Sequence, residues 1–243
     1  MSPPPADAVV LEERDTTNGV AILKLSQPPV NALDAAAFDS AELALRELAQ
    51  TAGIRAIVLT GGGTRAFCAG TDLAAFETPA ALARAQQASA RFFATLAELP
   101  VPLVGALNGP AVGGGAMIAS ECDVLVAVPG AWFALPEVAA GLLGGGSHAR
   151  RLAPYFKGLR MLLLGERLSA QEALESGVLA AVVEPHELRA TALAWARRLA
   201  ALDPAALRAA RAIYRAPAAA AARDGYADER GALAELLAER AAT

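Results

Sequence analysis

The sequence predicts an α/β fold in a single domain with a largely parallel sheet. Short apolar runs such as Ile54–Thr60 and Cys122–Val128 alternate with helical segments, which is the pattern of strands joined by helices. The chain has 243 residues, of which 55% are hydrophobic, so it can bury a sizeable core. Because no low-complexity linker interrupts it, we expect residues 1–190 to form the core and residues 191–243 to be a helical C-terminal extension of the same domain.

The first hundred residues indicate a hairpin followed by two helices. Val9–Glu13 and Gly19–Leu25 are strand-like and are joined by a polar turn. Asp34 is a suitable N-cap for an amphipathic helix that ends near Gln50, and residues 79–98 have a second helical pattern. The chain therefore starts with two antiparallel strands before the alternation of strands and helices begins.

The stretch from Val104 to Asp123 is the one around which the chain is organised. An apolar strand ends in Asn-Gly-Pro, and Gly113, Gly114 and Gly115 then open a short segment that reads as a buried helix of about two turns. Three glycines at a helix start indicate that a ligand approaches the main chain where a Cβ would block it. The alternative is close packing of this helix on a neighbouring strand. Free amides at such a helix start favour an acceptor oxygen or a developing negative charge.

The second half of the chain is more helical. Ser169–Glu172 forms a capping box, and a strand is expected at Leu179–Glu184. From residue 185 onward the pattern is helical to the end, with Gly225 and Gly231 expected to loosen the final segment.

Composition and charge exclude several classes of function. A net charge of −4 without any long basic run argues against a nucleic-acid partner. No secretory signal and no apolar stretch of spanning length is present, so we expect a cytoplasmic protein without a membrane partner. Cys68 and Cys122 lie far apart within apolar runs, which predicts reduced core residues and gives no support for a metal site or a disulfide.

Five short motifs follow one another in an order typical of a known family. They are Pro-Pro-Val-Asn-Ala-Leu (28–33), Ala-Ile-Val-Leu-Thr-Gly (56–61), Ala-Phe-Cys-Ala-Gly-Thr-Asp-Leu (66–73), Asn-Gly-Pro-Ala-Val-Gly-Gly-Gly (108–115) and Phe-Ala-Leu-Pro-Glu (133–137). Together they resemble the signature of the enoyl-CoA hydratase/isomerase, or crotonase, family, and the resemblance runs from about residue 9 to about residue 235. It implies a spiral of ββα turns with a helical C-terminal trimerisation region, an acyl-CoA substrate, a homotrimer or hexamer, and no cofactor apart from the coenzyme A of the substrate.

The resemblance also implies an oxyanion hole made by two backbone N–H groups, which map onto Thr71 and Gly114. Gly70 had already indicated a second place where the backbone is exposed to a ligand. Removing a proton next to a thioester places charge on the thioester oxygen, and each fixed donor stabilises that charge by about 3 kcal/mol. The residues expected to contact the substrate are Ala69, Gly70, Thr71, Asp72, Leu73, Ala74, Gly113, Gly114 and Met117.

One of the two acids of the family's hydratases is missing here. In those enzymes one glutamate follows the middle glycine by three positions, and the other lies twenty residues further on. In this chain the two positions hold Met117 and Glu137, so the spacing is intact and only the first glutamate is absent. We expect Glu137 to be the general base, because an apolar pocket raises the basicity of a carboxylate. Met117 is interpreted as pocket wall, since a thioether has no proton to move.

Three further positions bear on the second acid and on the binding of coenzyme A. His148 is a candidate acid/base or substrate contact, with a structural role at a helix start as the alternative. Glu121 lies one helical turn beyond Met117, where it is either catalytic or an ion-paired or solvated residue. Ala74 stands where many relatives carry a lysine near coenzyme A. The chain after Leu237 is shorter than the usual pattern, so the cover of the site is expected to be missing or supplied differently.

Three functions follow from this site. The favoured one is an enoyl-CoA isomerase-like enzyme in which Glu137 alone shuttles a proton, because that reaction needs one base and an oxyanion hole. The second is a hydratase or lyase in which His148, Glu121 or a bound water replaces the missing acid. The third is an acyl-CoA-binding paralogue without catalytic activity.

Overall fold

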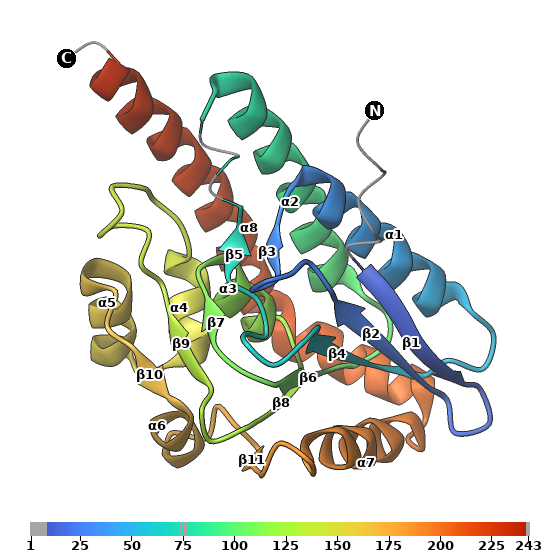
Figure 1. Ribbon diagram of the computed structural model, residues 1–243. Coiled ribbons are helices and arrows are strands. Elements are labelled where there is room, and N and C mark those ends of the chain that lie inside the picture. Colours follow the sequence, from blue (N-terminus) through green and yellow to red (C-terminus); the bar gives the residue numbers. More distant parts are fainter. Residues whose placement is uncertain (1–8, 73, 75–76, 242–243) are drawn as a thin grey trace.

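The protein is a mixed α/β structure built around one six-stranded sheet (Figure 1). The computed structural model describes residues 9–72, 74 and 77–241. The first strand pair is antiparallel and every later pair in this sheet is parallel, which confirms the predicted hairpin and the predicted parallel sheet. In sheet order the strands are β1 (Val9–Asp15), β2 (Val20–Leu25), β4 (Ala56–Gly61), β6 (Leu103–Leu107), β8 (Val124–Ala127) and β11 (Ala181–Val182).

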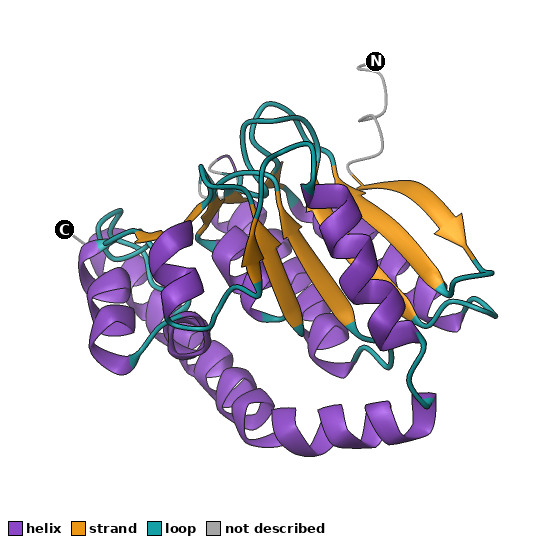
Figure 2. Cartoon of the chain, turned by 90° about the horizontal axis from the view of Figure 1, so that it is seen from below, coloured by secondary structure: helices purple, strands orange, loops and turns teal. Residues whose placement is uncertain are grey.

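Helices α1 (Ala35–Gln50) and α7 (Leu188–Ala200) pack against this sheet, and α2 (Pro79–Glu98) packs on α1. Figure 2 shows the strands with the helices around them. The N-cap prediction is confirmed, because Asp34 Oδ1 accepts a hydrogen bond of 2.8 Å from the Ala37 amide at the start of α1. Where α2 packs on α1, the rings of Phe38 and Phe92 are 5.6 Å apart. Helix α7 lies against the middle strands of the sheet. These elements enclose the main hydrophobic core.

Two small sheets connect the loops that follow the central strands. One pairs β3 (Ala32–Leu33) with β5 (Gly70–Thr71). The other has the order β10 (Leu168–Ser169), β9 (Trp132–Ala134), β7 (Ala111–Val112). A bridge between Cys68 and Ala111 joins the two regions next to the start of helix α3 (Gly114–Ser120). The small sheets therefore bring three distant segments of the sequence to one place.

The C-terminal half consists mainly of helices. The predicted capping box is present at the start of α6 (Ala170–Glu175). The other helices of this half are α4 (Gly146–Leu152), α5 (Tyr155–Leu164) and α8 (Pro204–Ala241). Helix α8 is continuous through Gly225 and Gly231, and the expectation that these glycines loosen the last segment stays a prediction. A glycine costs a helix interior only about 1 kcal/mol, whereas ending and restarting a helix requires a new nucleus.

Helix α8 is long enough to contact both α2 and α4 (Figure 1). Over the part of the chain that the structure describes, neither α8 nor any other helix combines the length and the apolar character needed to cross a membrane.

Candidate active site

The three consecutive glycines serve different purposes in the structure. A Cβ on Gly115 would lie 2.0 Å from the Cys68 carbonyl oxygen, so this glycine is required by close packing of α3 on a neighbouring segment. Gly113 has a φ of +53°, and a Cβ there would lie 2.7 Å from Glu137 Oε1. The interpretation that all three make room for a ligand is therefore corrected, because protein atoms occupy the space beside Gly113 and Gly115.

The start of α3 and strand β5 lie against each other. A Cβ on Gly70, which has a φ of +93°, would lie 2.9 Å from the Gly114 amide nitrogen. A Cβ on Gly114 would in turn lie 3.5 Å from the Thr71 amide nitrogen. Gly114 is the first residue of α3, so its N–H has no acceptor inside that helix. The structure thus brings together the two residues that the sequence analysis paired as an oxyanion hole.

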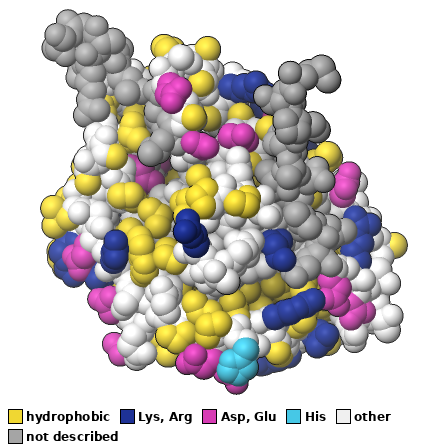
Figure 3. Space-filling view, viewed as in Figure 1, with side chains coloured by type: hydrophobic (Ala, Val, Ile, Leu, Met, Phe, Trp, Pro, Cys, Tyr) yellow, Lys and Arg dark blue, Asp and Glu magenta, His cyan; other side chains and the backbone are white. Residues whose placement is uncertain are grey.

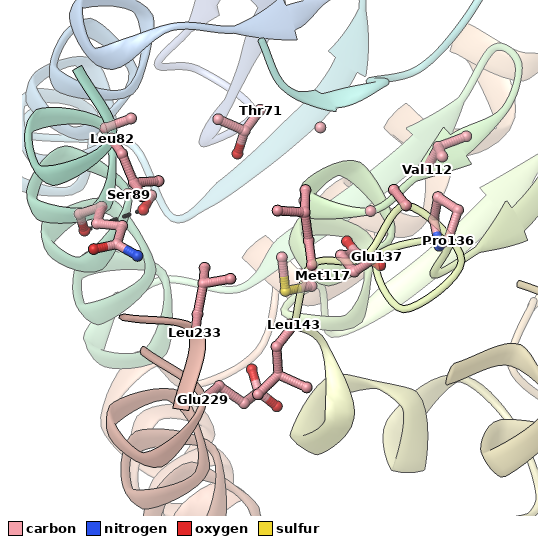
Figure 4. A pocket seen from close by; sticks show the side chains of 18 of the residues that line it. Thr71, Leu82, Ser89, Val112, Met117, Pro136, Glu137, Leu143, Glu229 and Leu233 are labelled. Atoms are coloured by element: carbon pink, nitrogen blue, oxygen red, sulfur yellow. Dashed lines mark hydrogen bonds between the residues drawn. The ribbon is translucent and has the colours of Figure 1, made fainter. Parts of the chain in front are cut away.

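A cavity of about 180 Å³ opens beside these two residues (Figure 4). Its lining is largely apolar, and most of the predicted substrate contacts belong to it. The predicted residues in the lining are Ala69, Gly70, Thr71, Gly113, Gly114, Met117 and Glu137. Asp72 and Ala74 are not in the lining; Asp72 Oδ1 instead accepts a 3.0 Å hydrogen bond from the Ala74 amide. Leu73 lies outside the described residues, so its predicted contact stays a prediction.

Glu137 is the titratable group of the cavity that has an unsatisfied atom. It lies three residues after the end of β9, and its Oε2 is buried without a hydrogen-bond partner among the described residues. Burial raises the pKa of Glu137 from 4.5 to about 7, and the nearby charge of Glu229 contributes in the same direction. A carboxyl group with a pKa near neutrality can both take and return a proton at neutral pH. The geometry therefore suits the role of general base predicted for Glu137.

Met117 contributes an apolar side chain at the position where a second acid was sought. It lies on α3, is 8% exposed and lines the cavity. Its thioether is drawn beside Glu137 in Figure 4. This location agrees with the interpretation of Met117 as pocket wall.

Two residues on α8 line the cavity and were not singled out from the sequence. Glu229 and Leu233 stand one helical turn apart and face the pocket, so α8 supplies the cover that the sequence analysis expected to be missing or supplied differently. The Glu229 carboxylate accepts hydrogen bonds from the amides of Gly145, at 3.0 Å, and Gly146, at 2.7 Å. Helical spacing shows only that the two side chains share a face, and nothing in the sequence indicates that this face reaches the cavity.

The other acid/base candidates lie in a buried cluster outside the cavity lining. Glu121 is 3% exposed and pairs with Arg151 at 2.5 Å and Arg215 at 2.7 Å, so the ion-pair interpretation is the right one. His148 is 2% exposed, with its Nδ1 2.8 Å from Ser120 Oγ. Burial lowers the pKa of His148 to about 4, which leaves the ring neutral at neutral pH. The structure therefore does not bring His148 to the substrate, which corrects its candidacy as a second acid, and its role is structural.

Comparisons with known proteins identify the family of this chain. The model of the family described as enoyl-CoA hydratase/isomerase matches residues 15–241. Among curated relatives, the (E)-benzylidenesuccinyl-CoA hydratase of Thauera aromatica is 35% identical over 201 residues, covering 80% of this chain and 78% of that protein. The carnitinyl-CoA dehydratase of Salmonella heidelberg (strain SL476) is 35% identical over 222 residues, covering 87% and 83%.

Solved structures give the same result. An enoyl-CoA hydratase from Mycobacterium avium subsp. paratuberculosis K-10 has a TM-score of 0.83 and 25% identity, over 96% of this chain and 95% of that one. Pseudomonas aeruginosa DspI has a TM-score of 0.82 and 29% identity, over 97% and 91%. The chain belongs to the enoyl-CoA hydratase/isomerase family and has the crotonase fold. It is an enzyme of the acyl-CoA-acting kind that defines this family.

Proposed function

We propose that this enzyme is an enoyl-CoA isomerase in which Glu137 is the single group that moves the proton. The observation that carries the proposal is the contrast between two positions in one cavity. Glu137 has a buried, unpartnered oxygen and a pKa raised to about 7, whereas the position of the second hydratase acid holds Met117. Migration of a double bond needs one base that takes a proton from one carbon and returns it to another.

The proposed reaction starts from a 3-enoyl-CoA. Glu137 takes a proton from the α-carbon, and the electron pair of that C–H bond spreads over a dienolate whose charge rests largely on the thioester oxygen. The amides of Thr71 and Gly114 are the proposed donors to this oxygen, and each is worth about 3 kcal/mol in comparable oxyanion holes. Glu137 then returns the proton to the γ-carbon, and the double bond lies between the α- and β-carbons of the product.

The second candidate function is hydration of a 2-enoyl-CoA. Two observations favour it: the Glu229 carboxylate lines the same cavity as Glu137, and two relatives are named hydratase and dehydratase. His148 and Glu121 give it no support, since neither lines the cavity. A bound water or Glu229 would have to act beside Glu137. A third candidate, acyl-CoA binding without turnover, predicts an occupied site and no product from either substrate.

Assays in heavy water that compare isomerisation of a 3-enoyl-CoA with hydration of a 2-enoyl-CoA separate these candidates. We expect the enzyme to convert a 3-enoyl-CoA to the conjugated 2-enoyl-CoA, and to hydrate 2-enoyl-CoA much more slowly, since each missing acid/base group costs about 100- to 10,000-fold. Met117→Glu, which restores the second carboxylate, should raise hydration relative to isomerisation. If the wild type hydrates short 2-enoyl-CoAs as fast as it isomerises, the hydratase function replaces the isomerase function.

We also propose that the protein is a homotrimer or a hexamer. On α8, Ile213 and Tyr214 are 77% and 88% exposed, and on α5 Phe156 and Leu164 are 73% and 70% exposed. Figure 3 shows apolar side chains gathered on the face of the molecule that carries α5. Exposed apolar patches of this kind mark association surfaces. Light scattering should give a multiple of three subunits, and a monodisperse monomer at micromolar concentration would contradict the proposal.

A further inference from the structure

The carboxylate of Glu229 stands at one end of the cavity and Thr71 at the other. In Figure 4 Thr71 is drawn at the top of the cavity and Glu229 at the bottom beside Leu143, with Leu233, Met117 and Glu137 at heights between them. If the thioester oxygen binds at Thr71 and Gly114, as the proposed function requires, the acyl chain passes Glu137 and continues toward Glu229. Glu229 then faces the end of the acyl group that is remote from the thioester.

The surrounding backbone is shaped to hold this carboxylate. The amides of Gly145 and Gly146 donate to its two oxygens at 3.0 and 2.7 Å. A Cβ on Gly146 would lie 2.9 Å from Glu229 Oε1, and Gly145 has a φ of +82°. Glycine at 146 therefore permits the close approach of backbone and carboxylate, whereas at 145 glycine suits the positive φ and leaves room for Leu135, whose Cδ2 would lie 2.7 Å from a Cβ. The carboxylate is fixed in direction by two donors from one segment.

Its hydrogen-bonding capacity is not used up by these contacts. A carboxylate has about four lone-pair sites; the amides of Gly145 and Gly146 occupy two of them, and the Ser147 amide also interacts with this carboxylate, which leaves about one site open. Among the described side chains, no lysine or arginine forms an ion pair with Glu229. An acyl chain that ends in a methyl group would strip water from this charge without replacing its hydrogen bonds, which is unfavourable.

We infer that Glu229 is a specificity-determining residue that selects acyl groups carrying a hydrogen-bond donor, such as a hydroxyl or an ammonium group, at the end remote from the thioester. This inference rests on the proposed placement of the thioester but not on which reaction Glu137 performs. A hydrogen bond to a charged group corresponds to a preference of about 10- to 100-fold in binding. The remaining wall is largely apolar, with Leu142 and Leu143 among its residues, and suits the hydrocarbon part of the chain.

Binding of saturated acyl-CoAs tests the inference without any chemistry. Calorimetric titration would compare chains of equal length that end in a methyl, a hydroxyl or an ammonium group, in short, medium and long series. In at least one series, the wild type should bind a donor-ended member about 10- to 100-fold more tightly than its methyl-ended partner. The hydroxyl and ammonium arms show whether the group selected is neutral or cationic.

Three variants complete the test. Glu229→Leu should remove the preference or reverse it, and Glu229→Gln should remove the preference for the ammonium group. Glu235→Gln changes an exposed glutamate of the same helix and should leave the preference unchanged. The inference is overturned if the wild type shows no preference at any length, or if Glu229→Leu weakens all three arms equally. If the Glu229 variants do not fold, the affinities of the wild type for the methyl-, hydroxyl- and ammonium-ended chains decide whether the inference holds.

The outcomes for this inference and for the isomerase function are distinguishable. A wild type that prefers donor-ended chains but does not isomerise 3-enoyl-CoA retains the role of Glu229 and loses the proposed reaction. A wild type that isomerises but does not discriminate between chain ends loses the role of Glu229 only. If Glu229→Gln abolishes hydration of methyl-ended substrates while their binding is unchanged, Glu229 is a second acid and not a specificity-determining residue for the end of the acyl chain.

Discussion

Two glutamates, one near each end of helix α3, have opposite surroundings. Glu137 is half-buried and lies against Gly113 at the start of the helix, with its Oε2 unpartnered among the described residues. Glu121 caps the other end, is buried, and is held by Arg151 and Arg215. Of the two, only Glu137 lines the cavity.

The comparison shows that burial of a carboxyl group is not enough to make it catalytic. A carboxylate taken out of water either finds cationic partners, which keep it charged, or shifts its pKa upward. Glu121 has two arginine partners and belongs to the scaffold behind α3. Burial instead raises the pKa of Glu137 to about 7, and its Oε2 has no partner among the described residues. The proposed role of Glu137 as the proton-transferring group depends on this missing partner.

The largest expected effect is on turnover in Glu137→Gln. Because the amide cannot take a proton, kcat for 3-enoyl-CoA isomerisation should fall by about 100- to 10,000-fold. The variant is isosteric, so affinity for a saturated acyl-CoA should change little. Steady-state kinetics and calorimetric titration measure the two quantities. An active Glu137→Gln enzyme would remove the contrast between the two glutamates.

A somewhat smaller loss is expected when one proposed oxyanion donor is removed. Gly114→Pro deletes the amide hydrogen, and proline is compatible with the first position of a helix, so turnover should fall by about 100- to 1,000-fold in a folded protein. Gly114→Ala is the matched control, because it keeps the N–H and introduces a Cβ at the same 3.3 Å from the Gly70 Cα. Equal losses of kcat in both variants, measured with circular dichroism as a check of folding, would show that crowding and not the donor is responsible.

The scaffold glutamate should behave in the opposite way. Glu121→Gln leaves Arg151 without its anionic partner and leaves Arg215 with only Asp123 among the described carboxylates, at 3.7 Å; breaking such a buried pair costs about 3–5 kcal/mol of the free energy of unfolding. We expect the lower end of this range, because both arginines retain partial exposure. Urea denaturation measures the loss. Turnover per folded molecule should stay at the wild-type level, and a large drop in kcat would assign Glu121 a part in catalysis.

Local signals made much of this architecture predictable. The Asp34 cap and the capping box at Ser169 and Glu172 depend on neighbours within three residues, so the sequence contains all the information they need. The order of the glycine motifs and the twenty-residue spacing between Met117 and Glu137 likewise indicate residues that line the cavity.

The remaining features depend on which distant atoms approach each residue. Glu229 bonds to a backbone amide 84 positions away, and this contact requires α8 to continue as one helix to the cavity. His148 was attractive because histidine titrates near neutrality, but the packing of Phe93 and Ser120 around it is a tertiary property. The contact of Gly115 with the Cys68 backbone is also a tertiary property, because the sequence does not indicate which segment packs against this glycine.

The smallest expected effect is on stability and has a defined pH dependence. The pKa of Glu137 is about 7 in the folded protein and 4.5 as a model value, so between these pH values the folded state holds a proton that the unfolded state releases. Stability associated with this group is fully present below pH 4.5 and is lost as pH rises through 7. Glu137→Gln has no proton to lose. Its free energy of unfolding should match the wild type in acid and exceed it above neutral pH by up to about 3 kcal/mol.

Denaturant titrations of the two proteins across this pH range measure the difference. Other titrating groups, His148 included, are common to both proteins and cancel in the comparison. Glu121→Gln provides the contrast, because its free energy of unfolding should lie below that of the wild type throughout the same range. A difference between Glu137→Gln and the wild type that does not change with pH would show that the Glu137 carboxylate finds a partner in solution. In that case the two glutamates of α3 would not differ in the way that the proposed mechanism requires.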